Sequence, residues 1–515
     1  MVHFPQEIHD NIVSFVETRI GEASVPFWER NNLPLARPPL AAVSRKFQRA
    51  VERLTFRALD TKPADLDDLE RILTPSRQRF LKHMSFELSV PSYPPRIGSD
   101  DYGTDRARRA NEEAATAMVR RLFRIMSSWS PQSSDEDSTP SVHFRLSGTS
   151  PTDDLLEEGH DYSMLDLTDM ARDFPPLPCV KKFEIANGAR VWHPRVPVVL
   201  TSKMARSAEV EWDLNVPEAP WDRYYIMNQN WRDGLVEALL LHPALPATVK
   251  DFSCALPAPL CEDMKVDSLP DFISPQNHDP VGLVLRRFTR DCSAISLDVP
   301  VHTSFFDPPP NCADDEPCWQ AVEYFTVKAN WCGPDGRWLF KDKNGATLSS
   351  DEPLLFINPQ LPPGYQSTPA ELQAALEYGD EWMWGRELPD PNSDEAAANQ
   401  VHRWVPDDAR VNALLTAFAR ACGRMLALHM ASLDIHYRSS ENWPLAVHCA
   451  APGKSIPGRN WDEKYATGGT ATWRIFIHAE NGWRPDEPTL EIFRAIGGDR
   501  GRGDAVICFL DWGDC

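Results

Sequence analysis

The residue types that most often carry catalysis or bind metals occur in this chain without the spacing that such chemistry requires. The 14 histidines are scattered along the sequence. His436 and His478 fall on two predicted strands, out of phase with the apolar positions, so we expect both on the solvent side of those strands. There is no nucleophile-elbow serine, no P-loop and no HExxH helix. The sequence therefore predicts no catalytic, cofactor-binding or metal-ligating residue and a protein that is not an enzyme.

Two other patterns might suggest a ligand site. The glycine-rich segment 497–503 follows a predicted helix and precedes a predicted strand. A phosphate-binding loop needs the opposite order, so we interpret this segment as a helix C-cap and a turn. The 11 cysteines include no CxxC pair, which favours reduced thiols in an intracellular protein. Cys254 and Cys508 occupy apolar positions of predicted strands and are expected in the core.

Composition excludes several classes of function. The chain has 53 basic and 75 acidic residues, and a formal net charge of −22 disfavours binding to nucleic acid. No apolar run approaches the roughly 20 residues of a membrane helix, and the N-terminus lacks the pattern of a signal peptide. We therefore expect a cytoplasmic or nuclear protein, and its 42% of hydrophobic residues is ordinary for a globular fold.

Short stretches of alternating apolar and polar residues recur along the chain, each led by an apolar residue. Such alternation is typical of a strand with one buried face. The clearest copies begin at Leu81, Val180, Val249, Val322 and Met430, and weaker ones lie near 210–214, 295–299, 473–477 and 506–510. Helical patterns occur between them, at 65–73, 110–126, 231–241, 281–290, 370–378, 407–426 and 488–496.

Strands that alternate with helices indicate parallel strands joined by crossovers, and two architectures satisfy that pattern. One is a leucine-rich-repeat-like solenoid and the other is a doubly wound sheet. The solenoid is favoured because central strands of a doubly wound sheet would be continuously apolar. We therefore predict an α/β fold in which an irregular leucine-rich-repeat-like β/α solenoid with parallel strands follows an N-terminal helical module.

Three stretches interrupt this predicted array. Residues near 91–105 and 128–140 are rich in Pro, Ser, Asp and Gly and are expected to be disordered loops. Residues 333–406 form an insertion. Tryptophans in polar loops are candidates for recognition of a target protein, with packing beneath the loops as the alternative. These are Trp331, Trp338, Trp443 and Trp461.

The N-terminal segment contains two short amphipathic patterns. Pro5 stands at a favoured first position of a helix and is followed by Ile8 and Ile12 at helical spacing. Leu40, Val43 and Phe47 begin a second apolar stripe. Two such helices cannot bury both stripes against each other, so part of this surface needs another partner. That partner is either the rest of the chain or a second protein.

The order Phe4-Pro5-x-Glu-Ile8, followed later by Leu40-x-x-Val43-Ser-Arg-Lys-Phe47, resembles an F-box. The whole chain is similar to the long F-box-type proteins of filamentous fungi. Phe4 replaces the usual leucine, and residues 17–38 form a longer connection than F-boxes normally carry. The resemblance implies an F-box-like module at 1–58, a first part of the array at 59–332, the insertion, and a final part at 407–515.

The resemblance also implies a function. The chain would be the substrate-recognition subunit of a Skp1–cullin–F-box ubiquitin ligase, with no cofactor. Its adaptor-binding residues would be Phe4, Pro5, Ile8, Ile12, Leu40, Val43 and Phe47. The array would bind an unknown target protein. One alternative is a solenoid scaffold whose N-terminal helices only cap the array, and another is an enzyme of unrecognised type. A cap would hide Phe4, Ile8 and Val43, whereas a docking module would leave them exposed.

Overall fold

The structure is a computed structural model. It describes Gln6, Ile8 and residues 41–91, 105–129, 141–150, 164–168, 173–188, 190–214, 225–256, 271–309, 318–342, 403–436, 444–457, 459, 461, 471–479, 482–498 and 503–510. The predicted helix at 370–378 lies outside these residues, as does most of the two loops predicted near 91–105 and 128–140.

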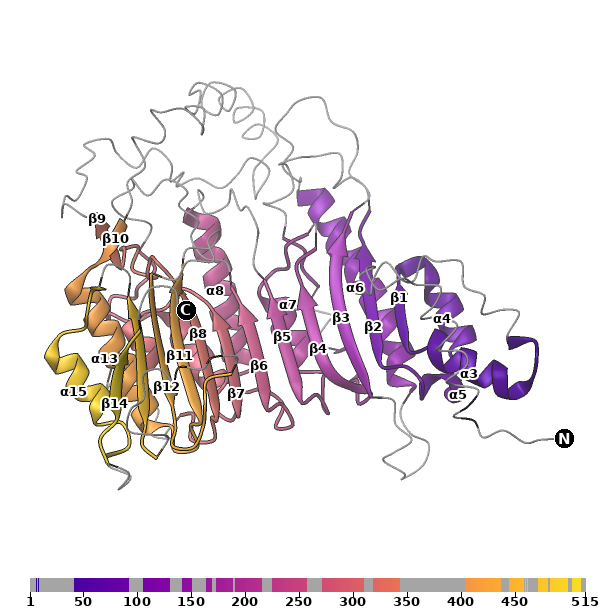
Figure 1. The fold of residues 1–515 in the computed structure, drawn as a ribbon. Helices are drawn as coiled ribbons and strands as arrows, with labels where there is room; N and C mark the ends of the chain where they lie inside the picture. Colours follow the sequence, from indigo (N-terminus) through magenta and orange to yellow (C-terminus); the bar gives the residue numbers. More distant parts are fainter. Residues whose placement is uncertain are drawn as a thin grey trace, which may run out of the picture.

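The described chain is an α/β protein built on a 12-stranded sheet (Figure 1). Neighbouring strands in the sheet follow one another in chain order. The strands are β1 (Ala58–Thr61), β2 (His83–Ser89), β3 (Val142–Thr149), β4 (Val180–Ala186), β5 (Glu209–Asp213), β6 (Asp251–Ala255), β7 (Ala294–Asp298), β8 (Tyr324–Asn330), β11 (Met430–His436), β12 (Leu445–Ala450), β13 (Arg474–Ala479) and β14 (Val506–Phe509). A doubly wound sheet would instead reverse its strand order at a switch point.

The sheet is parallel except at one strand. β12 pairs antiparallel with both β11 and β13. The prediction of parallel strands throughout is therefore wrong at this position. The reason is the short link 437–444 between β11 and β12, since a crossover to a parallel neighbour needs a dozen or more residues.

The helices lie along one side of this sheet (Figure 1). Successive helices contact each other in chain order from α7 to α15. The helices are α3 (Arg45–Thr55), α4 (Leu66–Ile72), α5 (Pro75–Gln78), α6 (Asp105–Ser127), α7 (Arg195–Thr201), α8 (Tyr225–Leu241), α9 (Pro280–Phe288), α10 (Thr303–Phe306), α13 (Asp408–Arg424) and α15 (Glu487–Arg494). The predicted helices that correspond to α4, α6, α8, α9, α13 and α15 are confirmed.

A continuous row of buried side chains crosses the sheet on the helix-covered face. Each member is in register with its neighbour on the next strand, and burial of one such side chain contributes about 1.5–3 kcal/mol. The row is Phe86, Leu146, Ile185, Trp212, Cys254, Leu297, Val327, Leu433, Val447 and Ile477. Residues two positions before and after each member face the same side of the sheet, and this explains the alternating sequence pattern.

The opposite face changes character along the sheet. On β2–β8 it carries polar, partly exposed side chains, whereas β11, β12 and β13 are buried on both faces. A second cluster covers the face there and consists of Ala450, Ile456, Trp461, Phe476, Cys508 and Leu510. His478 is therefore only 2% exposed, and its predicted place on the solvent side is wrong. His436 lies on this same face and is half-buried.

Both ends of the predicted insertion contain described structure. β9 (Phe340–Asp342) pairs antiparallel with β10 (Arg403–Pro406), which brings the two ends of that segment together. The eight cysteines in the described part of the chain are buried, and the predicted core positions of Cys254 and Cys508 are confirmed. None of the described helices is long and apolar enough to cross a membrane.

Gly497 lies in the turn that follows α15 and has a backbone conformation that favours glycine. Its φ is +97°, and a Cβ there would lie 2.4 Å from Cδ1 of Trp473. We expect Gly497→Ala to lower the free energy of unfolding by about 1–3 kcal/mol in urea denaturation. Gly453→Ala is the matched control, because its φ is also positive and no atom lies within 4 Å of the added Cβ. Equal losses in the two variants would contradict a role for the Trp473 contact.

Candidate functional site

The two pieces of the F-box-like sequence meet in the structure. Nε2 of Gln6 donates a hydrogen bond to the carbonyl oxygen of Lys46 at 3.1 Å, which joins the first piece to α3. Ile8 is 39% exposed and Val43 is 64% exposed. Phe4, Pro5, Ile12 and Leu40 lie outside the described residues. Two predicted adaptor-binding side chains thus form exposed apolar surface next to the start of α3.

The helix that follows is anchored at its far end. Ser44 caps α3 by accepting a hydrogen bond from the Phe47 amide at 3.3 Å. Ala50 and Val51 are buried in a small cluster that partly buried Phe47 joins. Farther along, Oε1 of Glu52 lies 2.7 Å from Nη2 of Arg77 in α5. The second half of α3 is therefore joined to α5, while Val43 stays exposed.

A dense layer of charged side chains covers the helix-free face at β2–β6. His143 and Arg145 on β3 both contact Glu184 on β4, at 3.0 and 3.2 Å. Lys182 lies 2.9 Å from Glu211 on β5 and 3.8 Å from Glu209. These contacts hold the pKa of Glu184 below its usual value, with the His143 hydrogen bond as the largest cause.

A buried polar pair lies on the same face where the sheet becomes covered. Oδ1 of Asp434 on β11 is 3.4 Å from Nε2 of His448 on β12, and the two residues are 4% and 7% exposed. Burial raises the pKa of Asp434 to about 7 and lowers that of His448 to about 4. Although the short separation suggests an ion pair, burial favours the neutral forms of both groups. Trp461 packs on His448 with ring centroids 5.1 Å apart, so this pair lies beneath a side chain.

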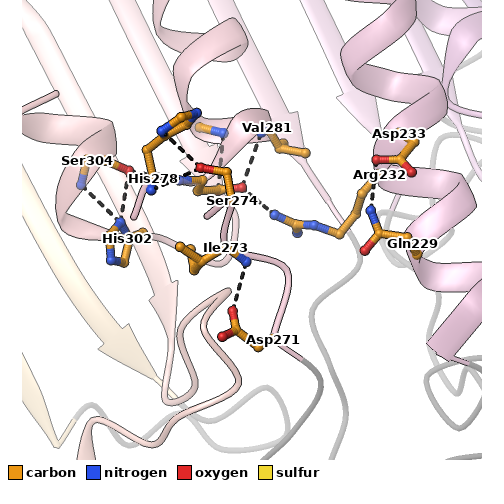
Figure 2. A network of polar contacts seen from close by, with 12 residues as sticks. Gln229, Arg232, Asp233, Asp271, Ile273, Ser274, His278, Val281, His302 and Ser304 are labelled. Atoms are coloured by element: carbon orange, nitrogen blue, oxygen red, sulfur yellow. Dashed lines mark hydrogen bonds and ion pairs between the residues drawn. The ribbon is translucent and has the colours of Figure 1, made fainter. Parts of the chain in front are cut away.

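Polar contacts also gather at the carboxyl ends of β6 and β7 (Figure 2). Asp279 caps α9 by accepting from the amides of Val281 and Gly282, and its Oδ1 lies 2.5 Å from Nη2 of Arg232 on α8. Its own amide donates to Oγ of Ser304 at 3.0 Å. This arrangement ties α8, α9 and α10 together at one edge of the sheet.

Two serine–histidine contacts in this network resemble the start of a catalytic arrangement. Oγ of Ser274 lies 3.0 Å from Nδ1 of His278, and Oγ of Ser304 lies 2.9 Å from Nδ1 of His302. Both pairs are local in sequence, and His302 caps α10 by accepting from the Ser304 amide at 3.3 Å. They are explained by turn and cap formation.

The tryptophans predicted to recognise a target are placed as follows. Trp331, Trp338 and Trp461 are buried, and Trp443 lies outside the described residues. Trp331 packs against Phe340 of β9, and Trp461 packs against Phe476 of β13. Packing beneath loops, the alternative considered from the sequence, therefore describes these three rings.

Within the described ranges, no group of three or more His, Cys, Asp or Glu residues is arranged to hold a metal ion. No protein-family model matches this chain, and no curated protein matches it. The candidate surfaces therefore rest on geometry alone. They are the exposed apolar residues beside α3 and the charged helix-free face. The Asp434–His448 pair was not predicted from the sequence, because the strand that carries His448 was missed.

Proposed function

We propose that this chain is a substrate receptor of a Skp1–cullin ubiquitin ligase, with no catalytic step of its own. The observation that carries the proposal is the exposure of Val43 and Ile8 within the F-box-like sequence. Contiguous exposed apolar surface is typical of a site that a partner covers, and we infer that Ile8 and Val43 belong to such a surface. The contact of Gln6 with Lys46 supports the same view, because it brings the two pieces of the motif together.

The array would present the target protein to the ligase. The chain-ordered strands and the helices along one side support a leucine-rich-repeat-like solenoid. Its helix-free face, with charged residues on β2–β6, is the surface on which we place the target. The contribution of such a receptor is proximity, since it raises the effective concentration of the target near the ubiquitin-conjugating enzyme.

A scaffold without a ligase role is the second candidate. The ion pair between Glu52 and Arg77 supports a capping role for the second half of α3. A cap explains why this half is anchored, but it gives no reason for the exposure of Val43. The two candidates differ in whether an adaptor binds.

Co-purification tests the difference. We expect the wild-type chain to retain Skp1. The amount of Skp1 that co-purifies with a combined Ile8→Asp and Val43→Asp variant should be at least tenfold lower. A charge placed in a desolvated apolar contact costs enough binding energy for that loss. The matched control is Leu426→Asp, because Leu426 is 66% exposed and far along the chain from the motif. Retention of Skp1 by the double variant, or absence of Skp1 from the wild type, would exclude the receptor.

A second variant in the same experiment tests whether Pro5, which lies outside the described residues, contributes to adaptor binding. Pro5→Ala combined with Val43→Asp changes one residue of each motif piece, and it should reduce adaptor binding as strongly as the first variant. Circular dichroism should show both variants folded, because Val43 and Ile8 are exposed in the isolated chain.

A further inference from the structure

Two histidines face each other on the helix-free face near the N-terminal end of the sheet. His83 on β2 and His143 on β3 are in register on adjacent parallel strands. Their Nδ1 atoms lie 3.3 Å apart, and the rings meet at an interplanar angle of 68°. His83 is exposed and His143 is half-buried, so solvent reaches the pair.

Glu184 determines how His143 presents its ring. Nε2 of His143 lies 3.0 Å from Oε2 of Glu184, and the other carboxylate oxygen lies 3.2 Å from Nη1 of Arg145. The hydrogen bond from His143 and the charge of Arg145 keep this carboxylate ionised, so it accepts a hydrogen bond from Nε2–H of the imidazole. In the neutral ring the lone pair is then on Nδ1, the atom that faces His83. A carboxylate behind a histidine is also the usual outer partner of a metal-bound imidazole.

The distance between the two nitrogens has the size expected for a shared metal ion. Ligands at 2.0–2.1 Å in tetrahedral geometry are separated by about 3.3–3.4 Å. Neutral imidazole is a preferred ligand for zinc and for the late first-row divalent ions.

We propose that His83 and His143 form a two-histidine site for a late first-row divalent cation such as Zn²⁺, with Glu184 as the residue that orients His143. The two remaining positions are open to water or to a side chain of a bound protein. The site does not depend on the ubiquitin-ligase proposal, because it involves neither the N-terminal segment nor an adaptor.

Calorimetric titration of the full chain with Zn²⁺, in a reducing buffer at pH 7.5, tests the site. We expect one Zn²⁺ to bind to the wild type. His83→Ala and His143→Ala should each weaken that binding at least tenfold, because the chelate needs both rings. His429→Ala is the matched control, since among the described residues His429 lies beside Glu323 at 3.4 Å and its ring meets Tyr324 rather than a second histidine. Its affinity should equal that of the wild type.

Glu184→Gln separates orientation from ligation. We expect the affinity for Zn²⁺ to fall about tenfold, because loss of an outer carboxylate typically costs 10–100-fold. His143→Gln provides a second variant with an uncharged side chain of similar reach, in case alanine perturbs the strand. No binding to the wild type, equal affinity in all variants, or loss in only one of the two histidine variants would overturn the proposal.

Discussion

Asp279→Ala is expected to lower the free energy of unfolding by about 3–5 kcal/mol, because it leaves a buried arginine without its carboxylate. Asp279 is 1% exposed and Arg232 is 7% exposed, and their side chains meet at 2.5 Å. The substitution also removes the acceptor for the amides of Val281 and Gly282 at the start of α9. Urea denaturation followed by circular dichroism measures the loss.

A set of companion variants separates the charge from the cap. Asp279→Asn keeps an acceptor for the Val281 and Gly282 amides but leaves Arg232 unpaired, so we expect most of the loss to remain. Adding Arg232→Met removes that charge and should recover much of the stability, since replacement of both partners of a buried pair is often nearly neutral. A loss below about 1 kcal/mol in Asp279→Ala would show that water reaches the guanidinium.

The sequence was sufficient to predict those strands that bury one face. β2, β4, β6 and β8 alternate in the sequence because helices cover one side and solvent the other. β3, which was not predicted from the sequence, alternates in the same way at Val142, Phe144 and Leu146. β11 keeps the alternation of apolar and polar residues although both of its faces are buried. The chain order of the strands in the sheet also agrees with the expectation from short strand–helix units.

Other elements gave no signal that a local pattern could detect. β12 is Leu-Ala-Val-His-Cys-Ala, which does not alternate because both of its faces are buried. α7 contains Pro197 near its start, where a missing amide is tolerated, although proline usually indicates a break. The coverage of His478 depends on Ile456 and Trp461 from a distant segment, and such tertiary contacts cannot be read from a strand. The prediction of adaptor binding remains a prediction, because it concerns contacts with a second protein.

Asp434→Asn is expected to change how stability depends on pH. The pKa of Asp434 is about 7 in the folded chain, compared with the ordinary value of 3.8 that applies to the unfolded chain. Between these two pH values the folded chain keeps the proton on Asp434 and the unfolded chain loses it. The stabilising contribution of Asp434 is therefore complete below pH 4 and is lost as the pH rises to 7. Asparagine removes this loss, which has an upper bound of about 4 kcal/mol at 1.36 kcal/mol per unit of pKa.

His448 has the opposite dependence. Its pKa is lowered from 6.5 to about 4, so the unfolded chain binds more protons between these values and His448 contributes stability as the pH rises. In the wild type the two effects largely cancel between pH 4 and 6.5. The stability of Asp434→Asn should therefore increase as the pH rises from 4 to 6.5, because only His448 still contributes a slope. The stability of His448→Gln should decrease as the pH rises over the same range.

Urea denaturation of the wild type and the two variants at pH 4.5, 5.5, 6.5 and 7.5 measures these slopes. The groups that face the pair are Lys328 on β8, His436 on β11, His478 on β13 and Arg459 in the covering segment. Their charges are common to all three proteins, so the differences between the curves isolate Asp434 and His448. Parallel curves would mean that both groups titrate as they do in the unfolded chain, and that Trp461 does not exclude water from them.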